Sequence, residues 1–431
     1  MVPTLSTLTQ IDQHCIWHPY TQMQNAFPPI PIVKGQGLYL YAEDGKSYID
    51  GISSWWVNLH GHAHPYIIQK IVKQAEALEH VIFADFTHPP AIELAQRLLP
   101  ILPGKMTKVF YSDNGSTAVE IALKMAIQYW KNRAKPHKIK IISFKNSYHG
   151  DTFGAMSAAG RNGFNRHFWQ HLFAVETITP PTEGNEENTF AQLEAILNGE
   201  DVACFIFEPL LLGSGGMISY SAAALNHLLK RCREKEVLTI ADEVMTGFGR
   251  TDTLFACDQL QETPDLICLS KGLTGGFLPL GVTACTKDIF EAFLGDSLQQ
   301  AFLHGHSYTA NPIACSTANG SLDLLLSASC FDQRKMIARK HAHFCANWQE
   351  HPHLKRCESV GTILILEFST TETSYFHSMR DQLYQFFLSK GILLRPLGNV
   401  LYVMPPYCIS EEELEYIYHN ITLTLESNEL F

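Results

Sequence analysis

The middle of the chain alternates short apolar runs with longer amphipathic segments. Runs such as KVFYS, ACFIFE and VLTIADE are mostly apolar, which is typical of strands that are buried on both faces. The segments between them, such as STAVEIALKMAIQYW, repeat apolar residues at intervals of three and four, as a helix that covers a sheet does. The pattern predicts an α/β domain with a mostly parallel sheet. Its strands are expected at residues 108–112, 140–143, 203–208, 237–243, 266–270 and 281–285.

The pattern changes toward the end of the chain. A helix expected at residues 330–348 leads into the strand-like ILILEF, and a second helix follows near residues 379–390. The stretch ILLRPLGNVLYVMPPY predicts two strands that pair across a turn at residues 397–399. These elements indicate a smaller α+β domain.

The amino-terminal part predicts a strand pair of its own. GLYLYAEDGKSYIDG is typical of a hairpin, with its turn at Asp44 and Gly45. We expect this hairpin to pack with the carboxyl-terminal elements, which makes the smaller domain discontinuous in sequence. The expected division is a large domain at residues 66–325 and a small domain at residues 1–65 and 326–431.

Charge and hydropathy restrict the partners and the location of the protein. The 431 residues include 32 Lys and Arg against 43 Asp and Glu, a formal charge of −11, which argues against binding to nucleic acid. The longest apolar stretch is interrupted by Glu208 and Pro209, so no membrane span is predicted. No basic residue precedes Lys34 and no apolar leader is present, so we expect a cytoplasmic protein.

Cysteine and histidine patterns do not indicate a metal site. Eleven cysteines without a C-x-x-C pair are expected to be mostly buried thiols, not zinc ligands or a disulfide framework. His60, His62 and His64 could face one metal ion only from a strand, and Gly61 and Pro65 favour a turn there. We therefore predict that no metal is bound.

Candidate chemistry begins directly after the first apolar run. In open α/β sheets, ligands bind beyond the carboxyl ends of the strands. DNGS, residues 113–116, follows the run KVFYS and opens a long amphipathic segment, whose first amides and dipole would hold an anion such as a phosphate. An ordinary helix cap is the alternative interpretation of this segment.

A carboxylate and an amine follow two later runs. Asp242 alone would be a cap or half of an ion pair, and Lys271 alone would be solvated. Together with a phosphate pocket, however, they are the parts that hold pyridoxal phosphate. Asp242 would face the pyridine nitrogen, where a pair about 4 Å apart gains roughly 4 kcal/mol at an effective dielectric near 20. Lys271 would bond to the cofactor aldehyde and, once released, move the substrate proton.

These residues lie in a stretch that resembles a known family over its whole length. ADEVMTGFGRTDTLFACDQLQETPDLICLSKGLTGGFLPLG, residues 241–281, is similar to the cofactor segment of class III, fold-type I aminotransferases. A narrower resemblance is to the branch that aminates 8-amino-7-oxononanoate to 7,8-diaminononanoate in biotin formation. It is carried by WHPYTQM, DGISSWWVNLHGHAHP, SYHGDTFGAMS, FEPLLLGSGGM and LRPLGNVLYVMPPY. The resemblance implies the fold-type I transferase fold, pyridoxal 5′-phosphate as cofactor, and a homodimer.

The resemblance also implies roles for cofactor-binding residues. Gly115 and Ser116 would bind the phosphate, and Tyr148 would stack on the ring and contact the substrate. The segment HGHS, residues 304–307, would reach the cofactor of the partner subunit, so each active site would be shared. Within that segment, His306 and Ser307 would bind the phosphate, and Gly305 would contact the substrate.

Five further residues are expected at the substrate cleft from the same resemblance. Tyr20, Trp55 and Trp56 would form an apolar wall, although core packing is their alternative role. Consecutive tryptophans on a strand could not both face one core, which favours the cleft. Arg395 would bind the terminal carboxylate of the substrate through paired hydrogen bonds. Arg250 would lie at the same cleft or, alternatively, in a surface ion pair.

Several alternatives stay open. Family members that use S-adenosylmethionine commonly have Pro-Thr after His-Gly, where this chain has His306 and Ser307, so S-adenosylmethionine and lysine both remain candidate amino donors. The competing activity is an ω-amino acid aminotransferase of the 4-aminobutyrate or ornithine type. A catalytically silent scaffold is a rival of another class. A dinucleotide-binding dehydrogenase is disfavoured because no G-x-G-x-x-G follows a strand.

Overall fold

The computed structural model describes residues 6–370 and 377–426. Its largest sheet has seven strands in the order β4-β12-β11-β10-β7-β5-β6. β12 is antiparallel to its neighbours β11 and β4, and the other neighbouring strands are parallel. The predicted, mostly parallel sheet is therefore confirmed. The strands are β4 (Met106–Ser112), β5 (Lys140–Phe144), β6 (Glu176–Ile178), β7 (Val202–Phe207), β10 (Leu238–Asp242), β11 (Leu266–Leu269) and β12 (Gly281–Thr286).

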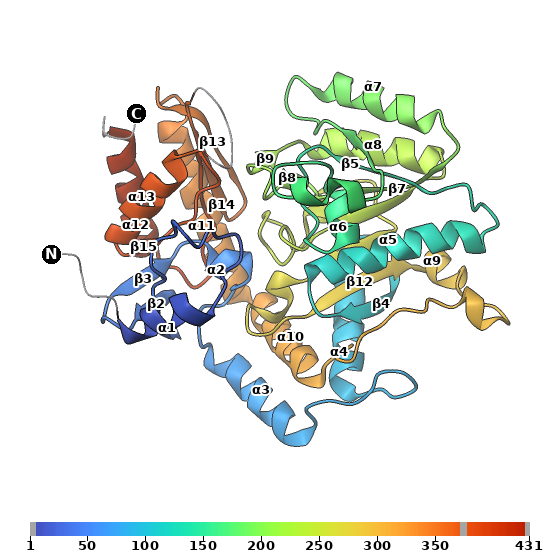
Figure 1. Cartoon of the computed structure of the whole chain (residues 1–431), viewed down its shortest axis with the longest axis horizontal. Coiled ribbons are helices and arrows are strands. Elements are labelled where there is room, and N and C mark those ends of the chain that lie inside the picture. The colour runs from blue at the N-terminus through green and yellow to red at the C-terminus, as the bar shows by residue number, and fades with distance from the viewer. Residues whose placement is uncertain (1–5, 371–376, 427–431) are drawn as a thin grey trace.

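Both faces of this sheet are buried, which explains why its strands are apolar throughout. Along β7, Ile206 joins one hydrophobic core and Phe207 joins the other. α5 (Gly115–Asn132) crosses one face in contact with β10, β11 and β12 (Figure 1). α8 (Ala222–Glu234) packs against β10 from the opposite core, with α7 (Glu186–Leu197) outside it. The result is a sheet with helices on both sides.

Three further helices support the carboxyl edge of the sheet. α10 (Pro312–Leu325) contacts α3 (Pro65–Ala77), α4 (Pro89–Leu98) and the short turn η4 (Lys271–Thr274). α10 therefore packs against the turn that carries Lys271. The other helices are α1 (Thr7–Cys15), α2 (Ser53–Trp56), α6 (Phe153–Ala158), α9 (Lys287–Glu291), α11 (Ala328–Trp348), α12 (Met379–Ser389) and α13 (Glu411–Glu426).

The smaller α+β domain is built from both ends of the chain, as predicted. β15 (Ile392–Leu393) pairs in parallel with β3 (Ser47–Asp50), so residues some 340 positions apart share one sheet. Figure 1 shows the amino-terminal and carboxyl-terminal elements together on one side of the molecule. The hairpin at Asp44 and Gly45 is confirmed, since β2 (Tyr39–Ala42) pairs antiparallel with β3. The exact domain limits at residues 65 and 325 stay predictions.

The second expected hairpin, at residues 397–399, is confirmed only at its turn. Leu397 and Val400 form an antiparallel bridge there, but the strands on either side do not pair with each other. β15 belongs to the sheet β1-β2-β3-β15, whereas β16 (Val400–Val403) pairs with β14 (Ile363–Phe368) in the sheet β13-β14-β16. Pro396 lacks the amide that a continuing ladder would need. The remaining strands are β1 (Ile32–Gln36), β13 (Leu354–Val360), β8 (Leu211–Leu212) and β9 (Ile218–Ser219). Within the described ranges, no helix is long and apolar enough to cross a membrane.

Candidate active site

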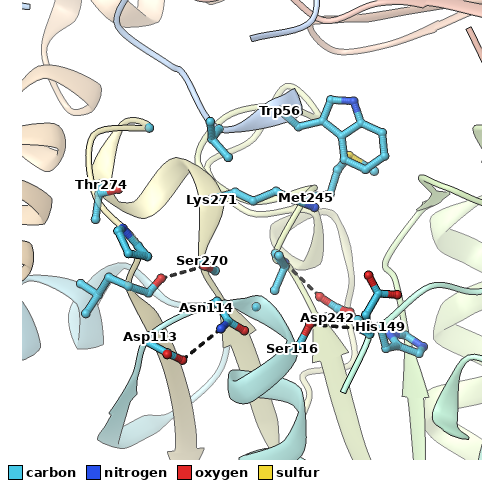
Figure 2. Close-up of a pocket in the computed structure, with 18 of the residues that line it drawn as sticks. Trp56, Asp113, Asn114, Ser116, His149, Asp242, Met245, Ser270, Lys271 and Thr274 are labelled. Atoms are coloured by element: carbon cyan, nitrogen blue, oxygen red, sulfur yellow. Dashed lines mark hydrogen bonds and ion pairs between the residues drawn. The ribbon is translucent and has the colours of Figure 1, made fainter. Parts of the chain in front are cut away.

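A cavity of about 660 Å³ lies at the carboxyl edge of the seven-stranded sheet. Its walls come from the junction of β4 and α5, the loop after β5, the end of β10 and the loop after β11 (Figure 2). Six residues that the sequence singled out line it together: Trp56, Gly115, Ser116, Tyr148, Asp242 and Lys271. The expectation that polar groups after separate apolar runs meet at one edge is therefore confirmed.

One end of the cavity is the amino terminus of α5. The Asn114 side chain caps this helix by accepting a hydrogen bond from the Thr117 amide at 3.0 Å. Gly115 is required by close packing, because a Cβ there would lie 2.7 Å from Cγ1 of Val244. The Ser116 hydroxyl accepts a hydrogen bond from the Asp151 amide at 3.2 Å. Free amides and the helix dipole make this end suited to an anion.

Asp242 is held at the opposite side of the cavity by two hydrogen bonds. Its Oδ2 lies 2.7 Å from Nδ1 of His149, and its Oδ1 accepts from the Val244 amide at 3.1 Å (Figure 2). Both side chains are buried. The carboxylate is thus fixed in orientation before any ligand arrives. His149 was not predicted as a site residue, although it directly follows Tyr148 in SYHG.

Lys271 approaches the cavity from the turn after β11. Its backbone has φ of 44°, a left-handed conformation that costs a non-glycine residue about 1–3 kcal/mol and is typical of functional sites. Enclosure of the amine lowers its pKa to about 8, although Asp242 and Glu208 act in the opposite direction. Its Nζ lies 4.7 Å from the ring centre of Trp56. Such an amine is partly neutral near neutral pH and can act as a nucleophile.

Glu208 is a second buried acid that the sequence did not identify as a site residue. It accepts hydrogen bonds from the amides of Tyr148 and Gly213, each at 2.9 Å. Burial raises its pKa to about 7, with a further rise from Asp242, while His149 and the two amides lower it. Its position at the end of the run ACFIFE, like that of Asp242 at the end of TIAD, was the available signal.

The outer part of the site is a cluster of hydroxyl and indole groups. Tyr20 and Tyr148 have their hydroxyls 3.3 Å apart, and both donate to the carboxylate of Asp151. The Tyr20 ring packs edge-on against Trp55 at 5.6 Å, and the Arg395 guanidinium lies 4.9 Å from the same indole. Asp151 was not predicted. The predicted cleft residues Tyr20, Trp55 and Arg395 are therefore neighbours. Tyr20 and Arg395 also line a second cavity of about 860 Å³.

Trp55 and Trp56 do not lie on a strand, although their expected placement at the cleft assumed a strand. Ser53–Trp56 (α2) is a left-handed turn in which all four residues have positive φ, between 46° and 75°. Each such residue costs about 1–2 kcal/mol relative to a right-handed turn. Trp56 is 3% exposed and faces the first cavity, whereas Trp55 is 37% exposed and faces Arg395. The turn thus sends the two indoles to different parts of the site.

Arg250 is not in a surface ion pair, so that alternative is wrong. Its guanidinium is buried and donates to the carbonyl oxygens of Pro405 at 2.9 Å and Asn58 at 3.2 Å. It also lies over the Tyr407 ring, at 4.9 Å. Arg250 joins the segment after β10 to the small domain, and its contact with substrate stays a prediction.

Gly305, His306 and Ser307 do not line either cavity of the single chain. The Oγ1 of Thr309 lies within hydrogen-bond distance of both the amide and the carbonyl of His306, and Gly305 and Ser307 are exposed. Their predicted role requires a second subunit and stays a prediction.

His60 and His62 of HGHAHP each bond to a protein side chain, and the cysteines are mostly buried. His60 bonds to the Ser321 hydroxyl at 3.0 Å, and His62 bonds to Asp50 at 2.9 Å, so the two rings have separate partners. All eleven cysteines are free, and nine of them are buried, which confirms that they are mostly buried thiols.

Comparison with known proteins agrees with this geometry. The class III aminotransferase family matches residues 20–425. The adenosylmethionine-8-amino-7-oxononanoate aminotransferase of Synechococcus elongatus is 46% identical over 95% of this chain and 98% of its own length. The protein of the same name from Helicobacter pylori is 39% identical over 95% of each chain.

Solved structures confirm the expected fold. The crystal structure of the adenosylmethionine-8-amino-7-oxononanoate aminotransferase of Methanocaldococcus jannaschii has a TM-score of 0.92 and 36% identity, covering 97% of this chain and 98% of that one. An omega transaminase from Pseudomonas jessenii in complex with PMP has a TM-score of 0.91 and 26% identity, covering 98% of each chain. The fold, the lysine and carboxylate at one cavity, and this similarity all agree. The chain belongs to the class III aminotransferases.

Proposed function

We propose that this enzyme uses pyridoxal 5′-phosphate to aminate 8-amino-7-oxononanoate to 7,8-diaminononanoate, a step of biotin formation. The observation that supports it most is that the Lys271 amine shares one cavity with Asp242 and the amino terminus of α5. The reaction is the one for which the relatives at 46% and 39% identity are named. Because this is a biosynthetic reaction on small molecules, we also expect the enzyme to work in the cytoplasm.

The residues that line the cavity fit the cofactor. Gly115 and Ser116 would hold its phosphate at the start of α5, Asp242 would face the ring nitrogen, and Tyr148 would cover the ring. The bound cofactor supplies an electron sink for the carbon that gains or loses the amino group. Asp242 favours a protonated ring nitrogen, because His149 and the Val244 amide keep its charge fixed toward the cavity.

Lys271 is the proposed proton carrier. In its neutral form, the Nζ can accept a proton from one reacting carbon and then, as the ammonium form, deliver it to a second reacting carbon on the same side. Enclosure favours that neutral form, while Asp242 and Glu208 keep part of the amine protonated. The pKa of about 8 therefore allows the same nitrogen to act as base and as acid near neutral pH.

The substrate would lie along the aromatic residues at the outer part of the site. Its apolar chain would pack on Tyr20, Trp55 and Trp56, and its carboxylate would bind Arg395. Arg395 lies over the Trp55 ring, which holds the planar guanidinium beside that chain. A short ω-amino acid would leave this wall unused, which favours the long-chain substrate over 4-aminobutyrate or ornithine.

Homodimer formation with shared sites is part of the proposal. Gly305, His306 and Ser307 do not line the cavity of their own subunit, so each set would complete the site of the other subunit. The amino donor is S-adenosylmethionine or lysine, and mixing each with the enzyme while following cofactor absorbance distinguishes them.

The test is turnover of purified enzyme with 8-amino-7-oxononanoate, compared with 4-aminobutyrate. We expect the oxononanoate to be preferred, and K271A to lose about a thousandfold or more of this activity while remaining folded. Substitution of the exposed Lys287, K287A, is the control and should leave turnover unchanged. Normal turnover by K271A, or preference for 4-aminobutyrate, would overturn the assignment.

A further inference from the structure

The left-handed turn of α2 is held by a buried carboxylate that has no role in the chemistry above. Asp50 ends β3, and its side chain is fully buried. Its Oδ1 accepts hydrogen bonds from the amides of Ser54 at 2.8 Å and Ile52 at 3.4 Å. Its Oδ2 accepts from the Ser54 hydroxyl at 2.7 Å. One side chain therefore binds the turn at three points.

His62 fixes Asp50 from the other side. Its Nε2 lies 2.9 Å from Oδ2 of Asp50, and its Nδ1 lies 3.2 Å from the side-chain nitrogen Nδ2 of Asn58. Asn58 in turn accepts from the Gly61 amide at 2.8 Å. The ring has little room to move, because even a Cβ on Gly35 would lie 2.8 Å from the Cβ of His62. The carboxylate, the ring and the turn form one connected network.

The turn delivers two indoles to two separate parts of the site. Trp56 donates its Nε1 hydrogen to the Tyr402 hydroxyl at 3.0 Å, and its ring lies beside Lys271. Trp55 packs against Tyr20 and under Arg395. A right-handed backbone at these residues would direct the two side chains elsewhere. The strained left-handed turn of α2 thus places one indole beside Lys271, where the reaction is proposed to occur, and the other beside Arg395, where the substrate carboxylate is proposed to bind.

We propose that Asp50, supported by His62, is a positioning residue that determines specificity for the long-chain acceptor. It acts through Trp55 and Trp56, whose spacing between Lys271 and Arg395 it maintains. This inference rests on the proposed function, because it assigns the wall to the chain of the oxononanoate. A strained backbone persists only where several contacts hold it in place, and the hydrogen bonds of Asp50 are contacts of this kind.

The test compares D50N, W55A and the double variant with the wild-type enzyme. D50N keeps the shape of the side chain but loses charge and one acceptor oxygen. We expect KM for 8-amino-7-oxononanoate to rise about tenfold with kcat within about threefold, because the turn acts on binding and not on the proton transfer. In the W55A background, D50N should raise KM clearly less than in the wild-type background, because one of the two residues through which it acts is gone. D44N changes an exposed carboxylate of the same segment and serves as the control.

A second readout does not depend on turnover. The difference in near-ultraviolet circular dichroism between wild type and W55F reports the fixed environment of Trp55. We expect this difference to be lost in the D50N background while the far-ultraviolet spectrum stays unchanged. Should D50N fail to fold, H62Q keeps the carboxylate, removes the imidazole and should show the same effects in weaker form.

The outcomes separate the two proposals. Wild-type enzyme that does not turn over the oxononanoate would overturn the proposed function, and the dichroism would still decide whether Asp50 holds the turn. Wild-type turnover, with unchanged KM and unchanged Trp55 dichroism in D50N, would overturn the inference alone. Additive effects of D50N and W55A would show that Asp50 does not act through Trp55.

Discussion

At the scale of single residues, removal from water sets the chemistry of this protein more than charge pairing does. Lys271 has two carboxylates nearby, yet its pKa falls, because enclosure of the amine outweighs their attraction. Glu208 and Glu243 show the same effect with the opposite sign, since burial raises the pKa of each to about 7. Burial thus brings the pKa values of these three groups close to neutral pH.

The lowered pKa of Lys271 predicts how the cofactor-free protein recombines with pyridoxal phosphate. Only the neutral amine attacks the aldehyde, so the rate should rise with pH up to about 8 and then level off. D242N removes an anion that raises this pKa, so its curve should level off at lower pH. Cofactor absorbance measures both rates. A rate that keeps rising through pH 10, as for an ordinary lysine, would contradict the prediction.

Glu243 predicts a pH-dependent stability. It lies outside the cavity and accepts hydrogen bonds from the Thr246 hydroxyl and the amides of Ala256 and Cys257. Its folded-state pKa of about 7 exceeds the ordinary value of 4.5, so the folded chain keeps this proton longer than the unfolded chain. The stability that this proton contributes is therefore full below pH 4.5, falls as the pH rises toward 7, and is lost above that pH.

For this one group the loss between pH 5 and 7.5 is about 2 kcal/mol. We expect E243Q to have a shallower decline of the thermal unfolding temperature over this range than wild type. The control is E187Q, a change of an exposed carboxyl in the first turn of α7. An E243Q profile parallel to that of wild type would mean that Glu243 titrates normally.

At the scale of elements, the sites follow from where strands end. Asp242 and Lys271 could be found in the sequence because each directly follows an apolar run, and parallel strands bring their carboxyl ends to one edge. The pairing of His149 with Asp242 joins residues 93 positions apart, and no local pattern marks it. The α2 turn was missed because Ser-Ser-Trp-Trp contains no glycine, the usual sign of a left-handed backbone.

The packing of α5 against the segment after β10 gives a prediction for cofactor affinity. G115A should weaken cofactor binding about tenfold, or ~1.4 kcal/mol, because the new methyl group would meet Val244 and shift the start of the helix. Equilibrium dialysis measures the affinity. The double variant G115A/V244A removes the clash and should recover part of the loss. Equal affinities of G115A and wild type would show that this close approach does not shape the phosphate site.

At the scale of the whole molecule, the alternation of apolar runs predicted the layers, but pairing between distant segments could not be predicted. β15 has only two residues, and its partner β3 lies near the other end of the chain, so a local hairpin was the nearer interpretation. Long-range pairing depends on the packing of the whole small domain, to which no short window of sequence has access.

Shared active sites predict that two inactive variants restore each other. K271A lacks the amine, and a variant with both H306A and S307A lacks the residues proposed to act in the other subunit. After unfolding and refolding together, half of the dimers should be mixed, each with one intact site, so activity should reach about a quarter of wild type. Refolding each variant alone is the control. If sites were not shared, the mixture would only average the two parents.

The pairing of β15 with β3 also sets an order of events during synthesis. β3 is made early, but its partner is synthesised only after some 340 further residues, which takes roughly 20–70 s at typical elongation rates. The strands of the seven-stranded sheet end with β12 at Thr286, so all of them are synthesised before β15. The nascent chain therefore contains every residue that lines the first cavity before β3 can meet its partner, and Arg395, which is proposed to bind the acceptor carboxylate, is added after that partner strand.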